Sequence, residues 1–285
     1  MSDQERILAV DLMGPGSQPE EEGSLSYLTM PAEMATFDTP LMPEPEEIGD
    51  CSAAFALLDR VQLALQDRSV AAATVFDLAG LDESSLTFIN QLLGVGEVSV
   101  SIASETPIEI QESVMAGLWR VLQRDSAGQL MHDYLEVAAI PSVVVRSAFE
   151  SARHCVPTDM SEVRQGIANA PALLVEIDEK IRHLQPGAAS HMINLSLLPL
   201  SAEDLILLGE RLGVGPVTIL SRGYGNCRIG STACKSTWWI KYYNSEDALI
   251  MNTIEVVDVP EVAMAAPEDL ADSAERLHEI LEIYR

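Results

Sequence analysis

LDESSLTFINQLLGVGEV (residues 81–98) and LSAEDLILLGERLGVGPV (residues 200–217) are two versions of one stretch, 119 positions apart and aligned without a gap. The same register continues beyond them through Trp119 and Trp238, Glu136 and Glu255, and Pro141 and Pro260. Repeats of about 20 to 50 residues are typical of solenoids, whereas a repeat this long indicates a duplicated domain.

The repeated stretch predicts a helix with a defined start and end. Ser201 and Asp204 form a capping-box pattern, and Asp82 takes the corresponding cap position in the first copy. Gly94 and Gly213 follow the last apolar residues of the pattern, where glycine commonly ends a helix. We therefore expect one capped helix in each copy.

The segments around this helix predict a sheet. A short apolar strand precedes it, at residues 74–78 and 194–198, and several β-branched runs follow it with no helix between them. Strands connected in this way form a largely antiparallel sheet. Pro267 opens a terminal helix, and its counterpart is expected near residues 148–166. The predicted fold class is α+β, with two tandem copies of one unit, each a mostly antiparallel sheet packed with helices.

Three regions are expected along the chain. Residues 1–50 form an acidic, proline-rich arm, extended or disordered, with twelve acids against the single base Arg6. Residues 51–166 form the first α+β repeat, and residues 170–285 form the second. Spaced apolar residues in the arm leave two interpretations open: the arm lies along its own domain, or it binds a partner.

The overall charge narrows the class of partner. A formal charge of −27 over 285 residues argues against binding to nucleic acid or to an anionic membrane, because both need clustered Lys and Arg. No apolar run approaches the roughly 20 residues that span a bilayer, and the acidic amino terminus does not resemble a secretory signal. We therefore expect a cytoplasmic protein with no membrane insertion.

The two copies differ most at residues 221–228. The second copy reads Ser-Arg-Gly-Tyr-Gly-Asn-Cys-Arg there, and the first copy shares none of these residues. Two glycines permit positive φ angles, so the loop could present backbone N–H groups beside two arginines to an anionic group. A tight turn between strands is the alternative interpretation. The candidate recognition residues are Arg222, Gly223, Tyr224, Gly225, Asn226, Cys227 and Arg228.

Added aromatic residues lie a little further along the second copy. Trp239, Tyr242 and Tyr243 replace polar residues of the first copy, whereas Trp238 matches Trp119 and is expected in the core. The three substitutions predict either a larger apolar surface for a protein partner or tighter internal packing. We include them among the candidate partner-binding residues.

The cysteines and the absence of known catalytic motifs indicate whether the protein binds a metal or catalyses a reaction. Cys227 and Cys234 invite a metal site, but they align with Ile108 and Met115, which indicates that both positions accept apolar packing. We therefore expect no metal site and no cofactor. The sequence contains no nucleophile elbow, zinc-protease motif or phosphate-binding loop, so we also expect no catalytic residues and no enzymatic activity.

A long run of the second copy resembles a known family. GPVTILSRGYGNCR (residues 215–228), EVVDVPEV (residues 255–262) and APEDLADSAERL (residues 266–277) are similar to the HupH/HyaF/HoxQ family of hydrogenase expression/formation proteins. Part of the arm, MPAEMAT (residues 30–36), is similar to it as well. The first copy resembles the family more loosely.

The resemblance implies a function that the residues alone do not give. It implies a cytoplasmic chaperone for maturation of an uptake [NiFe]-hydrogenase, with the precursor of the iron-sulfur small subunit as its partner before export. It also implies a thioredoxin-like hydrogenase accessory protein as a second partner. An iron-sulfur cluster-handling or redox-protective protein that uses Cys227 is the alternative.

Overall fold

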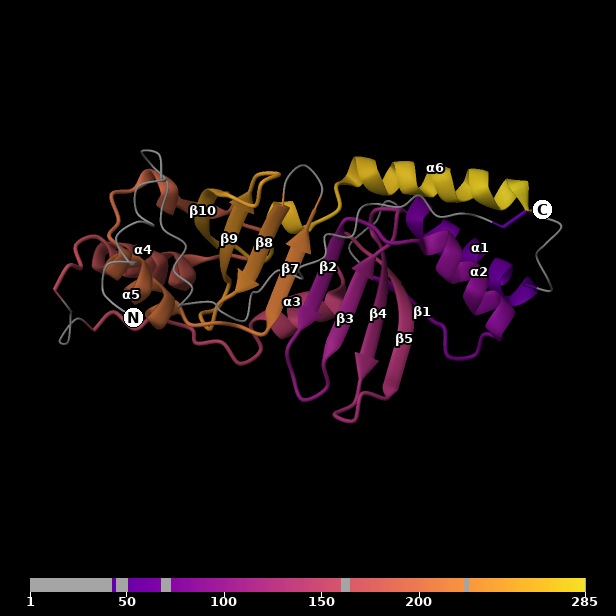
Figure 1. Cartoon of the computed structure of the whole chain (residues 1–285), viewed down its shortest axis with the longest axis horizontal. Helices are drawn as coiled ribbons and strands as arrows, with labels where there is room; N and C mark the ends of the chain where they lie inside the picture. Colours follow the sequence, from indigo (N-terminus) through magenta and orange to yellow (C-terminus); the bar gives the residue numbers. More distant parts are fainter. Residues whose placement is uncertain (1–42, 45–50, 68–72, 160–164, 223–225, 285) are drawn as a thin grey trace, which may run out of the picture. The chain divides into compact units, whose positions relative to one another are not determined.

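The computed structural model of the chain describes residues 43–44, 51–67, 73–159, 165–222 and 226–284 (Figure 1). The expected arm therefore lies outside the described residues except for Pro43 and Glu44. The rest divides into two compact units. The α1 unit contains the described residues within 43–147, 216–222 and 261–284, and the α4 unit contains those within 148–215 and 226–260.

The α1 unit is an antiparallel sheet with helices packed against it. Its strands run in the order β1-β5-β4-β3-β2-β7, and every pairing between them is antiparallel. The strands are β1 (Thr74–Asp77), β2 (Val98–Ile102), β3 (Ile108–Glu112), β4 (Leu118–Arg124), β5 (Leu130–Val137) and β7 (Val217–Ser221). The helices are α1 (Ser52–Gln66), α2 (Glu83–Leu93), α3 (Ser142–Ala148), whose last residue falls in the other unit, and α6 (Pro267–Ile283).

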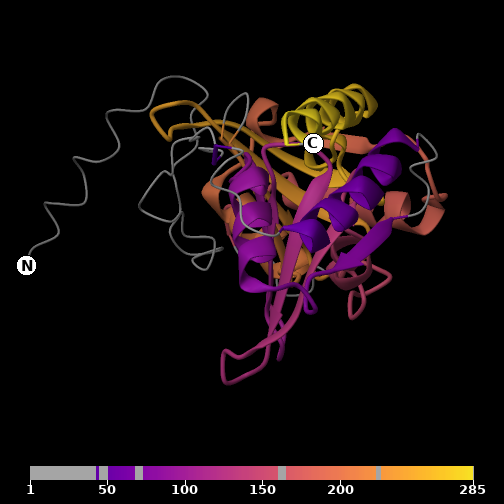
Figure 2. The ribbon, with the colours of Figure 1, turned by 90° about the vertical axis from the view of Figure 1, so that its right-hand side faces the viewer.

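The core of this unit joins residues from opposite ends of the chain. Apolar side chains of α1 and α2 pack with strand residues such as Phe76 and Leu135, and α6 adds Leu270, Leu277 and Leu281 to the same cluster. Figure 2 shows α6 beside α1. Each of these three leucines is at most 6% exposed, and burying such a side chain contributes about 1.5–3 kcal/mol. The first repeat therefore obtains part of its core from the end of the second repeat.

The α4 unit has the same kind of architecture. Its strands run in the order β8-β9-β10-β6, and the β8–β9, β9–β10 and β10–β6 pairings are antiparallel. The elements are α4 (Ala170–His183), β6 (His191–Asn194), the 3₁₀ turn η2 (Leu195–Leu197), α5 (Ala202–Leu212), β8 (Asn226–Ser231), β9 (Thr237–Tyr243) and β10 (Leu249–Val256). Val156, which belongs to the first repeat, is buried in the core of this unit. The predicted α+β class with antiparallel sheets is confirmed.

The glycines of the repeated stretch make the same contacts in both copies. Gly94 and Gly213 end α2 and α5 with φ angles of 54° and 64°. Gly96 N donates to Glu112 O at 2.8 Å, and Gly215 N donates to Ser231 O at 2.8 Å. A Cβ at Gly96 or Gly215 would lie 2.1 or 2.3 Å from an oxygen of the neighbouring segment. Only glycine therefore allows the chain to pass this close to the next strand.

Asp204 connects the starts of two helices. It completes the predicted capping box of α5 with Ser201, because each side chain accepts the other residue's backbone N–H. Its Oδ1 also accepts the N–H groups of Ala168, Asn169 and Ala170 at 2.9–3.0 Å, where α4 begins. Burial opposes ionisation of this carboxyl, but these backbone N–H groups hold its pKa below the ordinary value.

Two predicted elements differ from the structure. The strand predicted at residues 194–198 lies earlier, as β6, because the Asn194 side chain accepts Ser196 N and starts the turn η2. Among the described residues of the helix predicted near residues 148–166, only Ala148 is helical, as the last residue of α3. Residues 149–159 contain no helix: Arg153 N instead donates to Ala233 O, and Val156 N donates to the buried carboxylate of Asp178.

A buried carboxyl sits at the end of β3. Glu112 is 7% exposed, and its Oε1 accepts Gly117 N at 3.1 Å. Burial raises the pKa of Glu112 to about 7, and the nearby Glu97 and Asp269 carboxylates add to the shift. Folding therefore favours the protonated form of Glu112.

We predict that Gly117→Ala destabilises the α1 unit. Gly117 has a φ of +77°, and a Cβ there would lie 2.0 Å from Leu270 of α6. Left-handed strain and overpacking together should lower the free energy of unfolding by about 2–4 kcal/mol in urea titrations. Gly128→Ala is the matched control, because Gly128 has a φ of +82° with nothing within 4 Å. The control should lose only about 1–2 kcal/mol, and equal losses would contradict the packing argument.

We predict that Glu112→Gln stabilises the protein only towards high pH. The raised pKa means that ionised Glu112 costs stability increasingly as pH rises from 4.5 to about 7, and hardly at all below that range. The variant should therefore gain about 2–3 kcal/mol over the wild type at pH 8 and almost nothing at pH 4.5. Urea unfolding across this range is the measurement. Glu109→Gln, an exposed change on the same strand, is the control, and a pH-independent gain for Glu112→Gln would contradict the prediction.

Candidate functional site

The candidate recognition segment lies at the connection from β7 to β8. Arg222, in the α1 unit, is partly exposed, and its backbone N–H donates to Glu97 O at 3.0 Å. Gly223, Tyr224 and Gly225 lie outside the described residues. Asn226 begins β8 in the α4 unit, and its Nδ2 donates to Asp247 Oδ1 at 3.0 Å. The ends of the candidate loop are therefore placed by strands, while its central residues remain a prediction.

One face of β8 and β9 turns towards α4 and α5. Trp239 is 7% exposed in the core shared with those helices, and its Nε1 donates to Asn252 Oδ1 at 2.6 Å. Tyr243 is 8% exposed, and the Arg228 guanidinium lies over its ring, 5.5 Å from the ring centre. Packing therefore accounts for Trp239, and the Tyr243 ring is covered in part by a cation–π contact.

The opposite face brings together Cys227, Tyr242 and Glu255. Cys227 is 4% exposed and sits opposite Tyr242 in the β8–β9 register. Glu255 on β10 is also buried, and one of its oxygens accepts Ser190 Oγ at 3.0 Å. Burial, with the Glu255 charge second, raises the pKa of Cys227 to about 12. Burial also raises the pKa of Tyr242 to about 12, with Cys227 and Glu255 adding to it.

This cluster is suited to packing rather than to thiolate chemistry. Nucleophilic attack and metal binding both need the thiolate form of cysteine, which a pKa of about 12 makes rare near neutral pH. The aligned Ile108 of the first repeat is 8% exposed, so the corresponding position is also buried in that copy. Cys227 therefore behaves as a small buried residue in the described structure.

Cys234 occupies a different place. It lies in the loop between β8 and β9, where its Sγ is 3.6 Å from Leu212 O and 3.6 Å from Arg153 Nη2. Burial raises its pKa, and the Arg153 charge only partly offsets that effect. Its N–H bonds to Thr232 Oγ1, as Met115 N bonds to Ser113 Oγ at the equivalent turn. Within the described ranges, no three His, Cys, Asp or Glu side chains form a group that could hold a metal ion.

The structure separates the candidates into exposed and buried groups. Arg222, Asn226, Arg228 and Tyr242 are partly exposed, whereas Cys227, Trp239 and Tyr243 are buried. Sequence reasoning missed Asn252 and Glu255 as their buried polar neighbours. The repeat in the sequence could have pointed to Glu255, because a glutamate, Glu136, occupies the same position in the first copy, where it is also buried.

None of the helices in the described ranges has both the length and the apolar character needed to cross a membrane.

The fold and these residues define an α+β protein with two copies of one repeat and no metal-ligand cluster among the described residues. Residues 51–155 and 167–284 both match the HupH hydrogenase expression protein, C-terminal conserved region. The chain belongs to this family of hydrogenase expression proteins. The two matched segments correspond to the two repeats found in the sequence.

Several curated relatives match over nearly the whole chain. The hydrogenase expression/formation protein HoxQ of Cupriavidus necator is 44% identical over 96% of this chain and 96% of its own length. The hydrogenase expression/formation protein HupQ of Azotobacter chroococcum is 46% identical over 94% of this chain and 95% of its own length. The hydrogenase-1 operon protein HyaF of Escherichia coli is 35% identical over 95% of both. A solved structure of HupH from Thiobacillus denitrificans is 35% identical and covers 41% of this chain and 95% of its own, with a TM-score of 0.37.

We predict that alkylation distinguishes the cysteines. Cys155 is exposed, whereas Cys227 is buried with a pKa raised to about 12. Iodoacetamide at pH 8 should label Cys155 readily and Cys227 at least about 1,000-fold more slowly in the native protein. Mass spectrometry of tryptic peptides is the measurement, and labelling in urea is the control that all four cysteines react once unfolded. Comparable native rates for Cys155 and Cys227 would contradict the described burial.

Proposed function

We propose that this protein is an accessory factor, acting as a chaperone, in the maturation of an uptake [NiFe]-hydrogenase. The observation that carries the proposal is its similarity to HoxQ and HupQ, which are named hydrogenase expression/formation proteins, over 94–96% of the chain. Matches that extend over both proteins almost end to end support transfer of the general role. We propose no catalytic residues for this function.

The partner we propose is the precursor of the iron-sulfur small subunit, held before export. The formal charge of −27 fits a partner with basic segments, because opposite charges raise the rate of encounter. A thioredoxin-like hydrogenase accessory protein is proposed as the second partner, and the cytoplasm as the place of action.

The contact surface that we propose is narrower than the full set of candidates. Asn226, Arg228 and Tyr242 are partly exposed in the α4 unit, and Arg222 is partly exposed in the α1 unit. Tyr224 stays in the proposal from the sequence alone. Trp239 contributes by holding β9 against α4 and α5, so its substitution would act through the fold.

The competing hypothesis gives Cys227 a direct role with iron-sulfur clusters. Its burial and its pKa of about 12 both weigh against thiolate ligation in the described conformation. Anaerobic purification followed by iron analysis and visible absorption separates the two hypotheses. A colourless, iron-free protein that still supports hydrogenase maturation favours the chaperone, and stoichiometric iron lost in Cys227→Ser favours cluster handling.

We predict that Arg222→Ala combined with Tyr224→Ala weakens capture of the tagged small-subunit precursor by about tenfold or more. Arg and Tyr side chains are frequent energetic centres of protein interfaces, and a tenfold loss of affinity corresponds to about 1.4 kcal/mol. Capture from cells that express the hydrogenase operon, followed by quantitative blotting, is the measurement.

The matched control for this capture experiment is Lys180→Ala combined with Leu197→Ala. It removes one basic and one large exposed side chain from the α4 unit, at positions outside residues 221–228. The control should bind like the wild type. Undiminished capture by the Arg222/Tyr224 variant would overturn the assigned surface, whereas no capture by the wild type would overturn the small-subunit proposal itself.

A further inference from the structure

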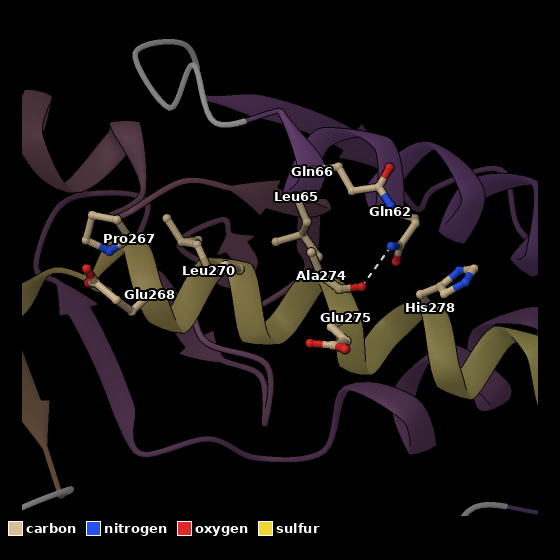
Figure 3. Close-up of a pocket in the computed structure, with 10 residues that line it drawn as sticks. Gln62, Leu65, Gln66, Pro267, Glu268, Leu270, Ala274, Glu275 and His278 are labelled. Carbon is tan, nitrogen blue, oxygen red and sulfur yellow. Dashed lines mark hydrogen bonds between the residues drawn. The ribbon is translucent and has the colours of Figure 1, made fainter.

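A pocket of about 560 Å³ lies between α1 and α6, entirely within the α1 unit (Figure 3). From α1 it is lined by Gln62, Leu65 and Gln66. From α6 the lining residues extend from Pro267 to His278, which corresponds to about 16 Å at the rise of an α-helix. An elongated hollow between two helices has the form of a groove that accepts an extended or helical segment.

The floor of this groove is apolar and its rim is acidic. Leu65, Leu270 and Ala274 are at most 7% exposed and form the floor, and the short Ala271 side chain leaves the groove open. Glu268 and Glu275 are exposed at its edge, and neither makes an ion pair within the described residues. The groove thus offers an apolar surface between two carboxylates.

Gln62 adds a buried hydrogen-bond acceptor. Its side chain is turned towards α6, and Nε2 donates to Ala274 O at 2.7 Å (Figure 3). The residue is 7% exposed, yet among the described residues its Oε1 has no hydrogen-bond partner. Buried acceptors are normally paired, because an unpaired one loses its hydration without compensation. Gln62 lines the pocket. Its Oε1 is almost inaccessible in this side-chain conformation, so a donor from an occupant reaches it only when the side chain turns further into the pocket.

We propose that the α1–α6 groove binds a segment of a partner protein that presents apolar side chains together with a lysine or arginine, and that donates an N–H to Gln62 Oε1. The apolar side chains cover Leu65, Leu270 and Ala274, and the basic side chain lies between Glu268 and Glu275. This inference is independent of the hydrogenase proposal, because it rests on the groove alone.

The acidic rim favours a basic partner segment over two other possible occupants, a second copy of the chain and the chain's own arm. A second copy of the chain would bring a surface with a formal charge of −27 to an acidic rim. The chain's own arm is the second alternative, because Tyr284 Oη, next to the end of α6, donates to Pro43 O. However, the arm carries a single basic side chain, Arg6, against twelve acids, so its net charge is strongly negative. A basic segment of a partner protein meets all three requirements: apolar side chains for the floor, a positive charge for the acidic rim and an N–H donor for Gln62.

The test uses the full chain and fluorescein-labelled synthetic peptides of 16 residues with capped ends. The first peptide carries Leu and Ala along one helical face and four Lys on the other. Two matched peptides replace every Lys by Glu or every Leu by Gln, and fluorescence anisotropy gives their affinities. We expect the Leu/Lys peptide to bind at least tenfold more tightly than either matched peptide. Equal binding of all three, or binding of none, would overturn the proposal.

Variants of the protein then locate the binding site. Ala271→Lys should weaken binding of the Leu/Lys peptide tenfold or more, because it fills the groove and adds a positive charge beside the two rim carboxylates. Glu268→Gln combined with Glu275→Gln should weaken it several-fold. Asp272→Asn combined with Glu279→Gln removes two charges from the same helix outside the pocket lining and should change affinity less than twofold. Equal losses in both charge variants would overturn a site in the groove.

Two further variants test the acceptor and the competing occupant. Gln62→Leu should lower peptide affinity about fivefold while circular dichroism and urea unfolding show an intact fold, and unchanged affinity would remove Gln62 from the site. Met34→Ser combined with Phe37→Ser removes apolar residues of the arm and should leave affinity unchanged. A marked gain in affinity would instead assign the groove to the arm and overturn the proposed partner.

Discussion

The fold depends on the close approach of two glycines to the strand beside them. Gly96 and Gly215 each donate to a carbonyl of the neighbouring strand at 2.8 Å, in a space that a Cβ would fill. This contact fixes where the chain enters the sheet after α2 and after α5. The side-chain period of a strand is two residues, so this entry point determines which residues of β2 and β7 are buried. Val100 and Ile219, which are equivalent in the repeat, pair directly in the β2–β7 ladder.

The repeat in the sequence does not coincide with the compact units of the structure. The α1 unit takes β7 and α6 from the second repeat, and the α4 unit takes the segment around Arg153 and Val156 from the first. The two borrowed segments are unlike each other, since α6 is a 17-residue helix while residues 149–159 contain no helix. Duplication therefore preserved the sheets, and the terminal segments diverged. The α1–α6 groove belongs to this diverged part.

Local patterns predicted the regular elements well because their causes are local. The caps at Asp82 and Ser201, the glycine ends of α2 and α5, and the buried Trp119 and Trp238 all followed from residue type and spacing. The candidate site was harder, since burial of Trp239 depends on α4 and α5, which contact it from elsewhere in the chain. The burial of Gln62 could not be predicted from the neighbouring sequence, because it depends on α6, more than 200 positions away.

The position of α6 has a consequence for synthesis of the chain. Leu270, Leu277 and Leu281 come from the last helix of the described chain and complete the core around α1 and α2. A nascent chain that already contains α1 to β5 therefore presents an uncovered apolar face until α6 has been synthesised. The core of the α1 unit can be completed only after the segments of the α4 unit, which precede α6 in the chain, have been synthesised.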